Sequence, residues 1–571
     1  MPGVRCQVPA VIILRLVVWL TQVDMTFCLV ASWLPLIKNF AGEGEMRRAN
    51  VTNLVGFLYG AGALALCFIA GLRVMPAAEA ALATTEVSLG KIDPGIISST
   101  LTVSRDGKRL AYEAYSGARQ WVVTDGVAGK EYDGIGNGTL VFSANSKRVA
   151  YAAFHGDKQL VVIDGVEGKE YDAISAGTPV FSPDSAHIAF GARRGGKWLI
   201  VVDGVEGEGC EAVAAGTPVF SPDSKRMVYG AQRNGKWRLV VDGTEGKEYD
   251  EILASTPVFS PDGKRVAYGA HRGNNWLVVI DGVEQKEFKG LAAGTLVFSP
   301  DGKRVAYGAW TGDKWLVVVD GVQGKEYDMV LAGGPVFSPD SKRVAYGAQR
   351  DGKWWVVVDR AEGKECDVMG AGTLMFSPNS KRLAYVAQLA GKWCVVVDGV
   401  EGRSYNGIGK GTLVFSPDSE RVAYQAQDAG GWRAVVEGVE GEEWDEILVG
   451  TPAFSPDSSH VALGARHGSK WFVLVDGVGG NQYDAIRVPI PLFSPDSRVV
   501  AYGARRAGKW VIVVGGVEGK EYDGFLKASR LVFDSATDLH TLAGRAGEFF
   551  RVEVVIGMPP TKGSGEPQPK L

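Results

Sequence analysis

Residues 298–309 read Phe-Ser-Pro-Asp-Gly-Lys-Arg-Val-Ala-Tyr-Gly-Ala, and close variants of this phrase recur through most of the 571-residue chain. A degenerate first copy has Val103 at the position of the opening Phe, and a last copy has Phe533, so there are twelve copies. A fixed period of this kind is the signature of a repeat architecture. The opening Phe returns every 39 residues, at Phe142, Phe181, Phe220, Phe259, Phe298, Phe337, Phe376, Phe415, Phe454 and Phe493.

One copy, residues 295–333, contains four short segments that are rich in β-branched or aromatic residues and bounded by turn residues. Such segments are typical of β-strands. The turn at 299–302 has a mechanism: Pro300 presets φ, Asp301 bonds nearby amides and Gly302 tolerates a positive φ. Four antiparallel strands in about 40 residues make one propeller blade. The four predicted strands are residues 296–299, 304–309, 315–319 and 325–330.

The two ends of the chain predict how the array closes. The last copy stops without a fourth strand, whereas residues 90–104, ahead of the first copy, match the end of a repeat in length. The N-terminal segment should therefore complete the last blade and remove an exposed edge. The fold class is all-β, a propeller of twelve four-stranded blades. Since propellers usually have four to eight blades, two tandem six-bladed rings are slightly favoured, and the alternative is one large ring.

Residues 1–85 indicate export. Arg47 and Arg48, an apolar run at 54–72 and the ending Ala78-Glu79-Ala80 are the three parts of a secretory signal. We therefore expect translation to start at Met46 and cleavage after Ala80. The run is also long enough to span a bilayer, so a retained membrane anchor at 54–72 is the alternative. Both predict an exported protein, in the periplasm or at the cell surface.

The rest of the chain divides simply. Residues 86–557 form the predicted propeller domain, and residues 558–571 form a Pro/Gly-rich tail that we expect to be disordered. The formal net charge of −4 and the isoelectric point near 6.0 give no reason to expect nucleic acid as a partner.

The sequence shows no catalytic set, so we expect no enzyme activity, no metal and no cofactor. The six His are spread over five copies without metal-ligand spacing, and neither a nucleophile elbow nor a phosphate-binding loop is present. The alternative is a carbohydrate-active, lyase-like propeller with a metal site in its channel, because His155, His271 and His467 share roughly one loop position.

The Ser-Pro-Asp-Gly-Lys-Arg phrase, with Phe before it and an aromatic residue after it, resembles the WD40-like repeats of the TolB family of periplasmic propellers. The resemblance covers residues 90–556 and implies a protein-binding platform at the bacterial envelope. Two features depart from the family: residues 1–85 leave no room for a separate α/β domain, and the phrase Asp-Gly-Val-Glu-Gly-Lys-Glu-Tyr-Asp is an addition of unknown role.

The turn between the second and third strands varies most among the copies, and it carries basic, amide and aromatic side chains. In a propeller this turn lies on the face that usually holds ligand sites, whereas the repeated Asp and Trp residues have structural explanations. We therefore predict an exported, non-enzymatic scaffold that binds a protein or a cell-envelope polysaccharide through this face. The candidate binding residues are Arg193, Arg194, Gln232, Arg233, His271, Arg272, Trp310, Gln349, Arg350, Arg466, His467, Arg505 and Arg506.

Overall fold

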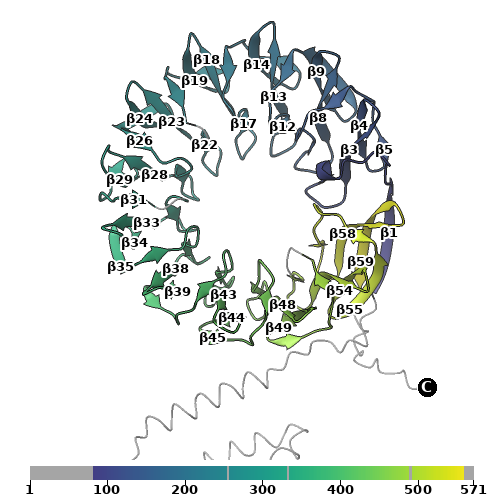
Figure 1. Cartoon of the computed structure of the whole chain (residues 1–571). Helices are drawn as coiled ribbons and strands as arrows, with labels where there is room; N and C mark the ends of the chain where they lie inside the picture. The colour runs from purple at the N-terminus through teal and green to yellow at the C-terminus, as the bar shows by residue number, and fades with distance from the viewer. Residues whose placement is uncertain (1–81, 254–255, 331–332, 488–490, 558–571) are drawn as a thin grey trace, which may run out of the picture. The chain divides into compact units, whose positions relative to one another are not determined.

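The computed structural model describes residues 82–253, 256–330, 333–487 and 491–557, and these form twelve antiparallel sheets arranged around a single ring (Figure 1). Each sheet is one blade, and successive blades follow one another in chain order. The predicted all-β propeller of twelve blades is confirmed. Residues 1–81 of the expected signal or anchor region and the C-terminal tail lie outside the described residues, whereas residues 82–85 belong to the first strand.

The blade of residues 290–323 shows the common pattern. Its innermost strand consists of two short segments, β26 (Gly290–Leu291) and β27 (Val297–Phe298), which both pair with β28 (Val305–Trp310). Strand β28 pairs with β29 (Trp315–Val319), and β29 pairs with the outermost strand β30 (Val322–Gln323). All these pairings are antiparallel, as the four-stranded blade predicted from the sequence requires.

The same strands recur in every blade. The second strands are β3 (Leu110–Ser116), β8 (Val149–His155), β13 (Ile188–Arg194), β18 (Met227–Arg233), β23 (Val266–Arg272), β28, β33 (Val344–Arg350), β38 (Leu383–Leu389), β43 (Val422–Gln427), β48 (Val461–His467), β53 (Val500–Arg506) and β58 (Asp538–Arg545). The third strands are β4 (Arg119–Thr124), β9 (Lys158–Ile163), β14 (Lys197–Val202), β19 (Lys236–Val241), β24 (Asn275–Ile280), β29, β34 (Lys353–Val358), β39 (Lys392–Val397), β44 (Trp432–Val436), β49 (Lys470–Val475), β54 (Lys509–Val514) and β59 (Glu548–Ile556).

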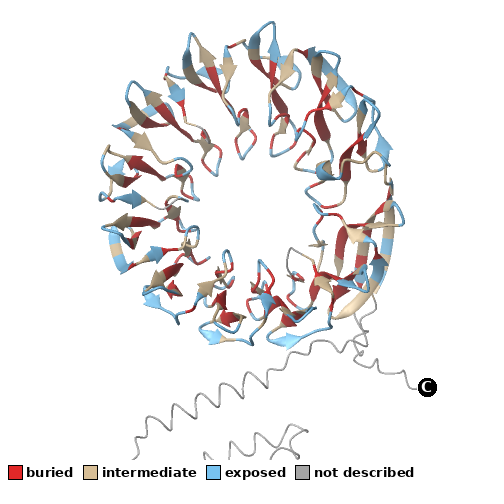
Figure 2. Ribbon diagram, viewed as in Figure 1, coloured by how far each residue is buried: buried red, intermediate tan, exposed pale blue. Residues whose placement is uncertain are grey.

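Neighbouring blades pack a face of large side chains against a face of small ones, which the alternation in the second strand predicts. Tyr307 and Val305 share one core cluster with Ala267 of the preceding blade. On the opposite face of the same strand, Ala306 lies in a cluster with Tyr346 of the following blade. Burying a large apolar side chain contributes about 1.5–3 kcal/mol, and Figure 2 shows buried residues running through the middle of the blades.

The predicted outer strand at 325–330 is wrong in its limits. The outermost strand is β30, and beyond it a single bridge, between Tyr327 and Trp315, still joins the chain to the third strand. Residues Met329–Val330 form β31, which pairs with β33 of the next blade instead. The chain leaves the outer edge after Tyr327 because the amide of Asp328 donates to the carbonyl of Gln349 in that next blade, at 2.8 Å.

The slight preference for two six-bladed rings is not met, since the twelve blades close one ring (Figure 1). Packed sheets lie about 10 Å apart, so twelve need a mid-blade radius of about 19 Å, and the inner strands then stand about 12 Å from the axis. Because neighbouring blades of so wide a ring meet at a small angle, bulk is required between their inner strands. The repeated Phe supplies it: the Arg304 guanidinium lies over the ring of Phe337 in the next blade, 5.2 Å from its centre.

An N-terminal strand closes the last blade, as predicted, but it lies largely ahead of residues 90–104, the segment that was expected to supply it. Strand β1 (Leu82–Lys91) pairs antiparallel with β59 along most of its length, from Leu82 opposite Ile556 to Lys91 opposite Glu548. Glu86 on β1 accepts two hydrogen bonds from the Arg545 guanidinium, at 2.8 and 2.7 Å, and one from the Tyr522 hydroxyl of the preceding blade, at 2.8 Å. The junction between the last and first copies is therefore both laddered and ion-paired.

Within the described ranges, none of the helical segments has the length and apolar character needed to cross a membrane.

Candidate binding surfaces of the ring

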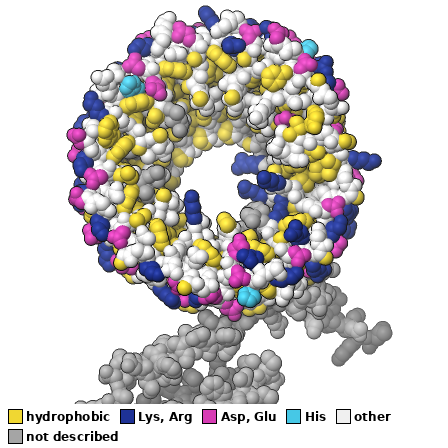
Figure 3. Space-filling view, in the orientation of Figure 1, with side chains coloured by type: hydrophobic (Ala, Val, Ile, Leu, Met, Phe, Trp, Pro, Cys, Tyr) yellow, Lys and Arg dark blue, Asp and Glu magenta, His cyan; other side chains and the backbone are white. Residues whose placement is uncertain are grey.

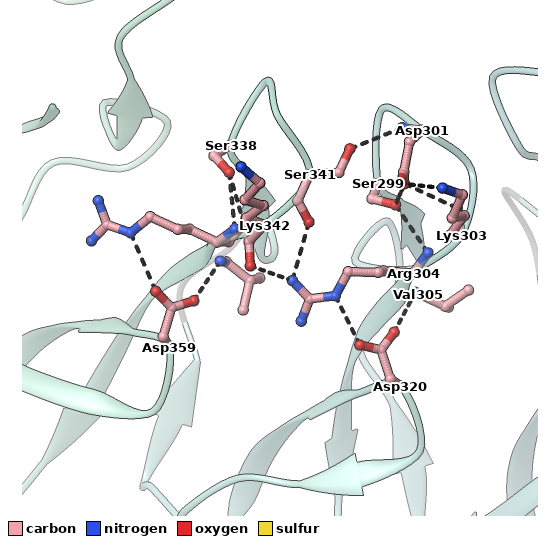
Figure 4. Close-up of polar contacts among 12 residues, drawn as sticks. Ser299, Asp301, Lys303, Arg304, Val305, Asp320, Ser338, Ser341, Lys342 and Asp359 are labelled. Carbon is pink, nitrogen blue, oxygen red and sulfur yellow. Dashed lines mark hydrogen bonds and ion pairs between the residues drawn. The ribbon is translucent and has the colours of Figure 1, made fainter. Parts of the chain in front are cut away.

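The Ser-Pro-Asp turns form a latch between neighbouring blades, shown for the sixth and seventh blades in Figure 4. Arg304 donates from Nε to Asp320 Oδ2, at 2.9 Å, and from Nη1 to the carbonyl of Lys342 in the next blade, at 2.7 Å. The amide of Asp301 donates to the hydroxyl of Ser341, also in the next blade, at 2.9 Å. The same crossing from Arg to the next turn is made by Arg109, Arg226, Arg265, Arg382 and Arg421.

Asp301 has the turn-stabilising role that its position predicts. Its Oδ1 accepts from the Ser299 hydroxyl at 2.6 Å and from the Lys303 amide at 3.1 Å. These two hydrogen bonds hold the pKa of the Asp301 carboxyl below its usual value. The repeated Ser-Pro-Asp phrase is therefore occupied with holding the ring together.

The added phrase Asp-Gly-Val-Glu-Gly-Lys-Glu-Tyr-Asp forms a belt around the outer rim. The Tyr327 hydroxyl donates to Glu362 of the next blade at 2.9 Å, and Lys325 Nζ lies 3.3 Å from the same carboxylate. Burial alone would raise the pKa of Glu362, but hydrogen bonds from Tyr327, Arg350 and Lys325 lower it below its usual value. The same Tyr to Glu bond joins Tyr171 to Glu206, Tyr249 to Glu284, Tyr405 to Glu440 and Tyr483 to Glu518.

The candidate residues of the variable turn fall into two sets with opposite orientations. The first set consists of the residues that pair directly across the sheet with the repeated Trp of the third strand. Arg193 lies over Trp198 at 5.8 Å, His271 stacks on Trp276 at 4.8 Å, and Trp310 packs on Trp315 at 6.4 Å. Trp310 is half-buried, which differs from the exposed side chain that we expected. The first set is Arg193, Gln232, His271, Trp310, Gln349, Arg466 and Arg505.

The second set faces the belt and is largely paired with it. Arg350 Nη1 lies 3.2 Å from Glu362, and Arg194 Nη1 lies 2.7 Å from Glu206. His467, the weakest member, stands 3.9 Å from Asp445 and is exposed. The remaining members of the second set pair as Arg233 with Glu245, Arg272 with Glu284 and Arg506 with Glu518.

The turn itself is fixed by the preceding blade. The amide of Gly195 donates to Asp172 Oδ2 at 2.8 Å, and Lys158 Nζ lies 2.8 Å from Asp172 Oδ1. Equivalent bonds fix the turns at Asp351 and Ala507. Because the guanidinium groups of the second set are already bound to carboxylates, the exposed cations left on this face are chiefly Arg193 and Arg505. Its role in binding stays a prediction.

The structure does not bring the candidate metal ligands together. His155, His271 and His467 lie on β8, β23 and β48, in three separate blades. His155 Nδ1 is 2.8 Å from Glu170, which gives it a local partner. No group of three or more metal-ligating side chains occurs in the ranges that the structure describes.

The channel wall is the surface that sequence reasoning missed. Among the described residues, a loop between the two segments of the inner strand projects toward the axis in most blades (Figure 1). None of these twelve loop sequences contains Asp or Glu, whereas four of their residues are basic. Figure 3 shows an open channel with hydrophobic side chains along its wall and Lys and Arg side chains projecting into it. The loops are residues 97–101, 136–140, 175–179, 214–218, 253–257, 292–296, 331–335, 370–374, 409–413, 448–452, 487–491 and 526–531.

Three exposed basic residues of the wall lie near the junction of the last and first blades: Lys527 and Arg530 in the last loop, and Arg105 just after the first inner strand. A fourth, Lys410, is exposed in the ninth blade. Within the described ranges none of these four takes part in an ion pair. Arg487 is different, because its guanidinium donates to the carbonyl of Ser529 in the next loop at 2.6 Å, and burial lowers its pKa to about 10.

Apolar side chains lie beside one of the exposed cations, Arg105. A groove between the first three blades is lined by Val103, Phe142, Pro179 and Phe181, with Arg105 at its edge. Hydroxyl groups of the loops bond to their own backbone: Thr295 Oγ1 donates to the carbonyl of Ala292 at 2.7 Å. The wall therefore offers apolar contact and positive charge. Aligning the copies at the inner loop, where acidic residues are absent, would have revealed this site from the sequence.

Comparison with known proteins adds little beyond the fold. No family model matches the chain, and no curated protein matches it. The solved structures that resemble it include TolB from Acinetobacter baumannii, at 15% identity over 54% of this chain and 77% of that one, with a TM-score of 0.20. The Cps50 (Swd1) β-propeller domain of Myceliophteria thermophila has 13% identity over 53% and 98%, with a TM-score of 0.22. The GH74 enzyme of Niastella koreensis has 12% identity over 80% and 84%, with a TM-score of 0.23. Similarity this low carries no argument about function, and the class that the described residues define is a β-propeller.

Proposed function

We propose that the protein is a non-enzymatic, TolB-like binding scaffold of the bacterial envelope that holds an acidic polypeptide segment of a partner protein in its central channel. The observation that carries the proposal is a channel wall whose loops contain basic residues and no acidic ones, although the whole chain has more acidic than basic residues. Fixed charges of one sign on a low-dielectric wall concentrate ligands of the opposite sign.

The chemistry of the wall favours a polypeptide over a polysaccharide. Recognition of a sugar needs polar groups that are available for hydrogen bonding, and the Thr295 hydroxyl already donates to its own loop. The Val, Pro and Phe side chains beside Arg105 instead fit apolar side chains of a peptide. An acidic segment with interspersed apolar residues would satisfy both properties of the wall.

Export is supported by the sequence ahead of the ring. The signal-like segment ends at Ala80, and β1 begins at Leu82. Cleavage after Ala80 would therefore leave the ring-closing strand complete. Amino-terminal sequencing of the protein isolated from its native cells tests this part, and an amino terminus upstream of Met46 would contradict the expected translation start.

The binding site is tested with a fluorescent peptide of alternating Glu and Leu residues. The channel variant carries Lys527→Glu and Arg530→Glu, and the matched variant carries Arg193→Glu and Arg505→Glu on the variable turns, with the same change in net charge. We expect the channel variant to bind at least about tenfold more weakly at low salt, the effect of about 1.4 kcal/mol. The matched variant should bind like the unmodified protein.

Equal binding by the channel variant and the unmodified protein would reject the channel. Loss of binding in the matched variant alone would move the site to the variable turns. An acidic polysaccharide run beside the peptide decides the partner class, because tighter binding of the polysaccharide would contradict the choice of a polypeptide.

A further inference from the structure

The last blade departs from the other eleven at one buried position. His540 on β58 pairs with Val532 of the inner strand, a register position that Ala306 occupies in the sixth blade. Ten of the other eleven copies have Ala at this position and one has Val228. This large polar side chain occurs in the last blade, which lies next to the first copy of the repeat.

His540 reaches across this junction. Its side chain is 1% exposed, and its Nε2 lies 2.7 Å from the carbonyl oxygen of Asp106, which belongs to the first copy. Its Nδ1 lies 2.6 Å from Asp534 Oδ2 in its own blade. The contact to Asp106 spans 434 residues of sequence. Contacts on both nitrogens therefore join the last turn to the first.

Both partners of the imidazole are acceptors. A backbone carbonyl can only accept, and an ionised carboxylate can only accept. Burial alone would raise the pKa of Asp534, but hydrogen bonds from His540 and Lys108 lower it below its usual value, which keeps the carboxylate charged. Two acceptors require two N–H donors, so the geometry is that of the imidazolium form.

We propose that His540 is a proton-dependent latch that holds the ring closed between the last and first blades. In the protonated form the side chain satisfies both Asp534 and Asp106. After loss of the proton only one nitrogen can donate, and one buried acceptor is left without its hydrogen bond.

At six of the other junctions an Arg, which keeps its charge, makes the crossing. Arg304 crosses to the next blade through Nη1, and arginine stays protonated throughout the range in which proteins fold. The last blade has Asp538 directly ahead of its second-strand Leu539, where the sixth blade has Arg304 ahead of Val305. His187 and His460 occupy the Arg position in the third and tenth blades, but they pair with Asp203 and Asp476 of their own blades, at 2.7 and 2.8 Å. The last junction is thus the one in which an imidazole makes the crossing.

The charged groups around the latch do not replace it. Lys108 lies 3.0 Å from Asp534 Oδ1, and it is about a third exposed. Arg109 of the first blade pairs with Asp125, and Arg551 on β59 pairs with Glu553, which stands opposite His540. The titratable and charged groups that face His540 are Asp106, Lys108, Asp534, Asp538 and Glu553.

The sign of the pH effect follows from which state binds the proton. Only the protonated ring of His540 can donate to both acceptors of the closed junction. The stabilisation is therefore present at low pH and is lost as the pH rises. Histidine generally changes charge between pH 5 and 8, and the proposal is tested over that interval.

Amide hydrogen exchange of the closing strands tests the proposal on the intact chain. Between pH 5.5 and 8, after correction for the intrinsic rate, β1 and β59 should lose about five- to a hundredfold of their protection relative to β28 and β29. This range corresponds to about 1–3 kcal/mol for a buried acceptor without its bond, at about 1.4 kcal/mol per factor of ten. In His540→Ala, which restores the residue of the other blades, the difference between the two pH values should disappear. The control His187→Arg should behave like the unmodified protein.

Two results would overturn the latch: protection of β1 and β59 that tracks β28 at both pH values, or an unchanged pH dependence in His540→Ala. If that variant does not fold, the protonation state is read directly. In a chain that keeps His540 as its single His, labelled with nitrogen-15, the ring should show two protonated nitrogens at pH 5.5. A neutral ring at that pH would refute the proposal.

Discussion

Replacing Arg304 by Ala removes the arginine contacts of the latch between the sixth and seventh blades and leaves the bond from the Asp301 amide to Ser341. The change deletes the ion pair to Asp320, the hydrogen bond to the Lys342 carbonyl and the stacking over Phe337. It leaves the fold of each blade intact, because the Val305 amide still donates to Asp320 Oδ1 at 3.0 Å. The loss should therefore be confined to one junction.

The expected cost is about 2–3 kcal/mol. The side chains of Arg304 and Asp320 are 28% and 42% exposed, so their ion pair contributes about 0.5 kcal/mol. A hydrogen bond from a charged donor contributes about 1.5 kcal/mol or more, and the partly exposed cation over an aromatic ring about 0.5 kcal/mol. A loss of this size opens the junction about 30- to 150-fold more often.

Hydrogen exchange of β28 and β33 measures this opening, and it does not require the whole ring to unfold in one step. Lys303→Ala is the matched control, because that side chain is 82% exposed and its one ion pair, to Asp301, is 3.7 Å long. It should cost less than about 0.5 kcal/mol. If the amides of β28 and β33 are equally protected from exchange in Arg304→Ala and Lys303→Ala, the account of the latch is wrong.

Two further predictions concern the turns and the closing strand. The Ser455 hydroxyl and the Ser459 amide lower the pKa of Asp457 to about 2, so its stabilisation is complete above about pH 4 and is lost as the pH falls toward 2. Asp457→Asn should lose less protection in β48 over that interval than the unmodified protein, since Asn145 and Asn379 already make the same turn bond, and an equal loss would contradict this. A chain that begins at residue 82 should fold as the full ring, whereas one that begins at residue 92 loses the β1 ladder, worth about 5 kcal/mol or more, and should aggregate or show a lower denaturation midpoint. Equal midpoints for the two truncations would show that β1 does not close the ring.

Most of the fold could be predicted from the period of the repeat. Strand identity, the turn role of Asp301 and the packing of Tyr307 against Ala267 follow from residues that recur at fixed spacing. Closure by the N-terminal strand followed from counting strands at the two ends. The number of rings did not, because the wedge between blades depends on how much bulk the inner Phe and the neighbouring Arg place between sheets.

The outer strand and the candidate site were harder for a different reason. Residues 325–330 look like one strand, yet they divide between two blades, and no local pattern marks where the chain crosses. The Arg residues of the variable turn looked available because their partners are distant. Arg350 pairs with a Glu twelve residues later, which also receives Tyr327 from the previous blade. Only the position of one blade against the next shows that these Arg side chains are already paired with carboxylates.

The pairing of β1 with β59 also fixes an order of events. The first described strand is made early in synthesis, and its partner, which ends at Ile556, is made last. Blades two to eleven can form from neighbouring residues as the chain grows, but the circle can only be completed after the final strand exists. Until then β1 is an unpaired edge, the kind of surface that recruits strands from other chains. Contacts between such distant residues form slowly, so the time between the first blade and the last is when this protein is most exposed to misassembly.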